Sequence, residues 1–116
     1  MPIQQFRQLE AWQQAHELVL AVYKATERVG GDERYGLVPQ MRRACVSVPA
    51  NIVEGFKRRT VSDKCRLYNI AEGSLEEVRY YLILCRDLGY ELDENLDDQA
   101  ERVAQLIAGM IRRLKA

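Results

Sequence analysis

The stretch that decides the fold is residues 60–89, which read TVSDKCRLYNIAEGSLEEVRYYLILCRDLG. Small and apolar residues recur here in alternating steps of four and three, the spacing of a helix face that packs along a bundle seam. The seam residues are Leu67, Ala71, Ser74, Val78, Tyr81, Cys85 and Leu88, with Tyr68, Leu75 and Leu82 in a second line beside them. Thr60 to Asp63 reads as a capping box that begins this helix, and Gly89 is suited to end it.

Two segments before this stretch follow the same rhythm. The first is marked by Trp12, Ala15, Val19, Val22, Thr26 and Val29, and Gly30-Gly31-Asp32 ends it. The second is marked by Met41, Cys45, Val48, Ile52 and Phe56, and Pro39 suits its first position. Pro49 lies inside this second pattern, where proline removes a hydrogen bond. We therefore expect a kink near Pro49, with a break into two helices as the alternative.

A fourth helical segment closes the chain. Its apolar line consists of Leu96, Ala100, Val103, Ile107, Met110 and Leu114, with Asp93 as the expected cap. No alternation of the kind that marks β-strands competes with these patterns. Because the connections are short, consecutive helices should lie antiparallel. The sequence predicts an all-α protein, an antiparallel up-down four-helix bundle that forms a single domain over residues 1–116.

Composition narrows the class of protein. The chain has 116 residues, of which 47% are hydrophobic, which suits one globular domain. Its start shows no secretory signal and no apolar run approaches the length of a membrane span. Cys45, Cys65 and Cys85 form no close pair, so we expect buried thiols in a reducing compartment. These features predict a cytoplasmic protein that does not act on a membrane.

The motifs of common enzymes and metal sites are missing from the sequence. His16 is the single histidine, and no glutamate precedes it at the Glu-x-x-His spacing of di-iron bundles. The serines lack the Gly-x-Ser-x-Gly elbow, and no glycine-rich loop is built to hold phosphate. We expect a protein that is not an enzyme and that uses no cofactor or metal.

Charge is unevenly distributed along a chain whose net charge is zero. Seven basic residues between positions 42 and 66, against Glu54 and Asp63, give a local charge of +5. They are Arg42, Arg43, Lys57, Arg58, Arg59, Lys64 and Arg66. Residues 87–101 carry seven acidic residues and no basic one. A basic cluster at the corner between the second and third helices suits phosphate binding.

Three structural roles compete with phosphate binding by these cations. They could cap the carbonyl groups at the C-terminus of the second helix. They could pair with the acidic region of a neighbouring subunit. Glu54 and Arg58, four residues apart, could pair on one helix face. The sequence leaves these alternatives open.

Aromatic content suggests self-association. The aromatic residues in question are Phe6, Phe56, Tyr68, Tyr80, Tyr81 and Tyr90. They exceed what one small core is expected to cover, and aromatic side chains are enriched at interfaces. We therefore expect a homo-oligomer.

An ordered set of segments resembles a known family. The segments are Trp12, Ala15, Leu18 and Val22-Tyr23; Tyr35-Gly36-Leu37 with Gln40 and Arg42-Arg43-Ala44; SVPANIVEG at 47–55 with Arg58; NIAEGSL at 69–75 with Glu77; and Leu88-Gly89-Tyr90. Together they resemble the bacterial four-helix-bundle proteins encoded in intervening sequences of 23S ribosomal RNA genes, and more distantly the accessory variability determinant of diversity-generating retroelements.

The resemblance implies an up-down bundle without enzymatic activity that assembles into a ring-like homo-oligomer, commonly a pentamer. It also implies nucleic-acid binding through basic surface and, for the retroelement relatives, binding to a reverse transcriptase. Gly30-Gly31-Asp32 and Val53 depart from the family's usual pattern without threatening the fold. The neutral net charge weakens the transfer of nucleic-acid binding.

Within the 47–55 segment, Asn51, Glu54 and Gly55 have both a structural and a functional interpretation. Asn51 could bond a carbonyl group that loses its donor near Pro49, and Gly55 would permit close approach of another helix. The alternative is direct ligand contact. Our leading hypothesis is a homo-oligomeric adaptor that binds structured RNA or DNA through the seven basic residues, with a protein-interaction module as the alternative.

Overall fold

The computed structural model describes residues 2–116, which form four α-helices and two short 3-10 helices. The α-helices are α1 (Glu10–Thr26), α2 (Leu37–Lys57), α3 (Val61–Asp87) and α4 (Asn95–Lys115). The 3-10 helices are η1 (Phe6–Gln8), before α1, and η2 (Gly31–Arg34), between α1 and α2. The molecule is a rod of 46 × 21 × 20 Å.

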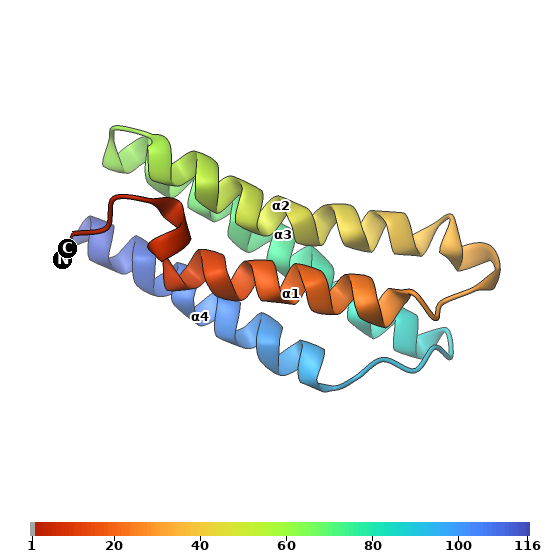
Figure 1. The fold of residues 1–116 in the computed structure, drawn as a ribbon. Helices are drawn as coiled ribbons and strands as arrows, with labels where there is room; N and C mark the ends of the chain where they lie inside the picture. The colour runs from red at the N-terminus through yellow and green to blue at the C-terminus, as the bar shows by residue number, and fades with distance from the viewer. Residues whose placement is uncertain (1) are drawn as a thin grey trace.

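The helices run alternately up and down the rod, and each packs against two neighbours in the cyclic order α1, α2, α3, α4. The chain ends and the α2–α3 corner lie at one end, while the α1–α2 and α3–α4 connections lie at the other (Figure 1). This arrangement confirms the predicted antiparallel four-helix bundle.

The core is built from most of the predicted seam residues, but Trp12 and Leu88 depart from the prediction. Leu88 is 53% exposed because α3 ends at Asp87, one residue before it. In α2, α3 and α4 the central seam residues, such as Val48, Val78 and Val103, are fully buried. In α1 the buried face is Ala11, Ala15, Leu18, Val19 and Val22, whereas Trp12 lies only half-buried at its edge. Trp12 instead packs edge-on against Phe6 of η1 and stacks on His16.

Proline 49 lies inside an unbroken α2, so the alternative of two separate helices is wrong. The carbonyl that loses its donor to the proline is that of Cys45, four residues earlier. The Asn51 side chain does bond a backbone carbonyl, but it is that of Ser47, at 2.8 Å. The expected rescue of the orphaned carbonyl by Asn51 is therefore wrong in its target.

The predicted helix ends are mostly confirmed. Thr60 accepts a hydrogen bond from the Asp63 N–H at 3.1 Å, which begins α3. Gly89 has a φ of +96° just beyond the end of α3, the left-handed conformation expected of a C-terminal cap. Asp93 accepts from the Asn95 N–H at 2.9 Å, but the residue that caps α4 is Glu94, so the predicted cap lies one residue too early. α2 begins at Leu37, two residues before the predicted start at Pro39.

Candidate nucleic-acid interface

The seven predicted basic residues do not form one surface. Lys57, Arg58, Arg59, Lys64 and Arg66 lie at the α2–α3 corner, while Arg42 and Arg43 lie near the start of α2. At the helical rise of about 1.5 Å per residue, Arg42 lies about 22 Å along α2 from Lys57. Two groups of cations therefore face different neighbours.

At the corner, four side chains are exposed and have no partner among residues 2–116. They are Lys57, Arg58, Arg59 and Arg66, which make no ion pair or side-chain hydrogen bond in the described part of the chain. The expected Glu54–Arg58 pair is absent from this part of the structure. The reason is that α2 ends at Lys57 and the Arg58 backbone is extended, with ψ at 155°. We call these four residues the corner cations.

Lys64 is committed to the fold. Its ammonium group donates to the carbonyl of Phe56 at 2.6 Å and to that of Gly55 at 3.3 Å, and it lies 5.4 Å from the centre of the Phe56 ring. A cation at the C-terminus of a helix satisfies carbonyl groups that have no partner in the helix. The capping alternative is thus confirmed for Lys64.

Arg42 is committed to another helix end. Its Nε donates to the Thr26 hydroxyl at 2.9 Å and its Nη2 to the Tyr23 carbonyl at 3.2 Å, both in the last turn of α1. Its guanidinium carbon also lies 4.5 Å from the centre of the Tyr23 ring. Arg42 therefore joins α2 to the C-terminus of α1, a capping role on a helix other than the expected one.

Three further cations lie at the same end of the rod as the corner cations. Arg112, Arg113 and Lys115 end α4, whose C-terminus shares this end with the α2–α3 corner (Figure 1). All three are exposed. The sequence does not associate them with the corner, because Arg66 and Arg112 lie 46 positions apart and only the up-down topology brings the two segments to one end.

Gly55 lets α2 and α3 approach closely at the corner. A β-carbon at this position would lie 2.6 Å from Cε1 of Tyr68 and 3.3 Å from Cβ of Leu67. Tyr68 is 3% exposed, so the ring has no free space to yield. The expected structural role of Gly55 is confirmed. Glu54, by contrast, is exposed and makes no ion pair among residues 2–116.

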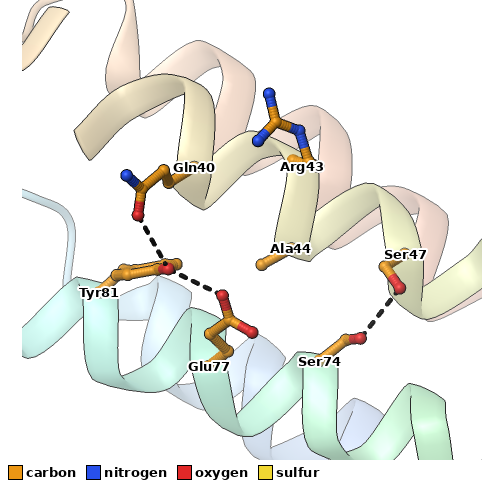
Figure 2. A pocket seen from close by; sticks show the side chains of 7 residues that line it. All are labelled: Gln40, Arg43, Ala44, Ser47, Ser74, Glu77 and Tyr81. Carbon is orange, nitrogen blue, oxygen red and sulfur yellow. Dashed lines mark hydrogen bonds between the residues drawn. The ribbon is translucent and has the colours of Figure 1, made fainter. Parts of the chain in front are cut away.

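A row of polar side chains lies between α2 and α3 in the middle of the rod. The Ser47 and Ser74 hydroxyl groups lie 2.9 Å apart, and the Asn51 amide donates to Ser47 Oγ at 2.9 Å. Tyr81 donates to Glu77 at 2.7 Å and bonds Gln40 at 3.3 Å (Figure 2). The hydrogen bond to Glu77 raises the pKa of Tyr81, and partial burial adds to it. All of these groups except Asn51 line a shallow groove of about 350 Å³.

This row of polar side chains joins the two family-like segments. Ser47 and Asn51 belong to the 47–55 segment, and Ser74 belongs to the 69–75 segment. Their side chains bond one another across the helix pair, which gives them a structural account. Figure 2 shows the Arg43 side chain directed away from this polar cluster. The groove therefore has no cation directed into it among the residues that line it.

Reactive groups have few neighbours that would activate them. Burial raises the pKa of the Cys45 thiol to about 12 and also raises that of Cys85. Thiols of this kind stay protonated and are poor nucleophiles. No group of three or more His, Cys, Asp and Glu residues within 2–116 is placed to hold a metal ion, and no helix of this region is long and apolar enough to cross a membrane.

The aromatic residues divide between core and surface. Tyr68 is buried within the monomer, so it gives no support to the expected interface. Tyr80 is 55% exposed, as expected, and Tyr35, which is not among the aromatic residues predicted at an interface, is 83% exposed. Phe6, Phe56, Tyr81 and Tyr90 are half-buried.

Comparisons with known proteins agree with this architecture. Residues 7–112 match the model of the family described as 23S rRNA-intervening sequence protein. The chain is also similar to the crystal structure of a protein of unknown function from the S23 ribosomal protein family of Bacteroides thetaiotaomicron VPI-5482. The TM-score is 0.79 at 19% identity, with 87% of this chain and 97% of the other covered, which shows a shared fold. A search of curated proteins finds no match. With a family match over nearly its whole length and the four-helix bundle observed, the chain belongs to the 23S rRNA-intervening sequence protein family.

Proposed function

We propose that the protein is a non-enzymatic nucleic-acid-binding bundle that contacts the phosphate backbone with one end of the rod. The observation that carries this proposal is that the corner cations have no partner among residues 2–116. Arg112, Arg113 and Lys115 of α4 extend the same positive end. The name of the family, which refers to 23S rRNA, is consistent with such a partner.

Unpaired cations at a helix corner suit phosphate for an energetic reason. Arginine presents a planar set of donors that matches two phosphate oxygens, and binding releases counterions from the nucleic acid. Since the corner cations are not held by carboxylates, binding breaks no internal ion pair. Lys64 and Arg42 are excluded from this surface, because their donors already bond helix carbonyls or Thr26.

Self-association would strengthen such a surface, and we include it in the proposal. A ring of copies, of which a pentamer is the form we favour, would present several positive ends to one nucleic acid. Linked sites bind more tightly than single sites when the geometry lets them engage together. Light scattering of the purified protein measures this directly, and a monomer at all concentrations would reject the ring.

The test of the binding surface is a mobility-shift titration with a structured RNA hairpin and a DNA duplex across salt concentration. Arg58→Ala with Arg59→Ala should reduce the slope of log affinity against log salt by about two. The matched control is Lys24→Ala with Arg28→Ala, which removes the same charge at the other end of the rod. Absence of binding at low salt, or equal losses in both variants, would reject the surface.

A protein-interaction module, such as an accessory to a reverse transcriptase, is the second candidate. The exposed aromatic residues Tyr35 and Tyr80 favour it, since tyrosine is enriched at protein interfaces. Purification from cell extract with and without nuclease separates the two. A stoichiometric partner that survives nuclease and is lost on Tyr80→Ser supports the module.

A further inference from the structure

A second cationic surface lies between α1 and α2, away from the corner cations. It is a groove of about 450 Å³ lined by Tyr23, Arg34, Val38, Pro39, Arg42, Arg43 and Val46. Three of these residues are arginines, and no carboxylate is among the lining residues of this described region. An anionic occupant would therefore meet three positive charges and no negative one at the wall.

The groove also has an apolar side. Val38 is 3% exposed and forms part of the floor, while Val46 is 42% exposed and offers its methyl groups to an occupant. A free phosphate or sulfate would gain nothing from this apolar surface. An occupant that uses the whole groove must carry both negative charge and a face that benefits from leaving water.

Arg42 forms a fixed flat wall of the groove. Its guanidinium carbon lies over the Tyr23 ring, 4.5 Å from the ring centre, and its N–H groups donate to the Thr26 hydroxyl and the Tyr23 carbonyl. Thr26 is 1% exposed, so this anchor is itself rigid. A guanidinium plane held in this way is a surface on which an unpaired nucleic-acid base can stack, as bases stack on aromatic rings and arginine planes.

Arg34 and Arg43 are free to hold the phosphates. Neither side chain makes an ion pair or a hydrogen bond within residues 2–116. They come from different elements, η2 and α2, and both line the groove. Their separate origin lets them contact successive phosphates of one strand.

From these contacts we infer that the α1–α2 groove binds an unpaired nucleotide of a single-stranded nucleic acid. The base stacks on Arg42 against the apolar floor, and Arg34 and Arg43 contact the flanking phosphates. The inference adds a single-strand site to the proposed function and does not depend on the corner cations. It also accounts for the position of Arg42 and Arg43, which the bundle separates from the other five basic residues.

The test compares fluorescein-labelled oligouridine of six nucleotides with an RNA duplex, using fluorescence anisotropy at one salt concentration. Arg34→Ala with Arg43→Ala should weaken binding of the single strand about tenfold and leave duplex binding unchanged. Lys24→Ala with Arg28→Ala is again the matched control, because neither residue lines this groove. Equal losses for single strand and duplex, or no loss for the single strand, would overturn the inference.

A second variant examines the stacking wall. Arg42→Lys keeps the positive charge but removes the plane, so single-strand affinity should fall while melting temperature reports any change in the α1–α2 contact. Oligouridine that contains 4-thiouridine should form photo-crosslinks to peptides that include Tyr23 or Val46. A hexaglutamate peptide that binds as tightly as the oligonucleotide and is lost in the same variants would show a protein ligand and overturn the inference.

The outcomes for the two surfaces remain distinguishable. Loss of single-strand binding in the groove variant with normal behaviour of the Arg58→Ala, Arg59→Ala variant would support the groove and reject the corner. The reverse pattern would support the corner and reject the groove. Absence of binding to every nucleic acid would reject both.

Discussion

The two ends of the rod use charge in opposite ways. At the α3–α4 connection, Arg86 bonds the Asp97 carboxylate at 2.7 Å and the Asp93 carbonyl at 3.1 Å. The bond to Asp97 raises the pKa of Arg86, although partial burial opposes the rise. At the α2–α3 corner the corner cations bond nothing within residues 2–116. At the α3–α4 connection Arg86 holds two segments together, whereas at the α2–α3 corner the corner cations remain exposed to solvent.

The comparison shows that a count of charges does not reveal their use. Lys64 and Arg66 are two residues apart on α3 and carry the same charge, yet Lys64 donates to two carbonyls of α2 and Arg66 faces solvent. The geometry of the nearest helix end decides which cation becomes part of the fold. The free energy of unfolding of suitable variants tests this division without any bound partner.

The largest effect should come from filling the close contact at the corner. Gly55→Ala would place a β-carbon against the buried Tyr68 ring, and overpacking of this kind lowers the free energy of unfolding by about 1–3 kcal/mol. Gly73→Ala is the control, because nothing lies within 4 Å of its β-carbon position and alanine favours a helix. Denaturant unfolding should show a loss for the first and a small gain for the second. Equal behaviour of the two would mean that the corner is loosely packed.

The next effect should come from the opposite end. Arg86→Met keeps much of the packed stem but removes the bonds to Asp97 and Asp93, which should cost about 1 kcal/mol given the exposure of both partners. Arg66→Met on the same helix should stay within about 0.5 kcal/mol of the parent protein. Urea midpoints of the two variants make the comparison. A cost for Arg66→Met as large as that for Arg86→Met would contradict the proposed division between the ends.

The smallest effect should separate two neighbouring cations of the corner. Lys64→Met removes the cap on the Gly55 and Phe56 carbonyls and should cost about 0.5–1 kcal/mol. Amide hydrogen exchange should also be faster in the last turn of α2 than in the parent protein. Arg66→Met serves again as the control and should leave that turn unchanged. Unchanged exchange in both variants would show that Lys64 is no more structural than Arg66.

Most of the fold could be predicted from the sequence because helical periodicity is a local property. The seams of α2, α3 and α4, the Thr60 cap and the Gly89 terminus all follow from residues within a few turns of one another. The errors arose where a distant contact decides the outcome. Trp12 lies on the predicted seam of α1, but η1 folds back and supplies Phe6 as its packing partner.

The candidate site was less predictable because it depends on topology. The sequence places Arg42 in the same basic cluster as Arg58, but 15 residues of helix direct them to different parts of the rod. It places Arg112 far from Arg58, but the up-down order returns α4 to the corner end. Capping of the α2 C-terminus by Lys64 is one of the alternatives that the sequence leaves open, and only the position of the α2 carbonyls selects it.

The elongated shape with opposite charge at its two ends makes this neutral protein an electric dipole. Because its net charge is zero, such a molecule is attracted only weakly by a distant polyanion. The field of the polyanion nevertheless exerts a torque that turns the positive end of the rod toward it. At physiological salt this alignment acts only within about 8 Å of the polyanion. Added salt should therefore slow association mainly by randomising the angle of approach.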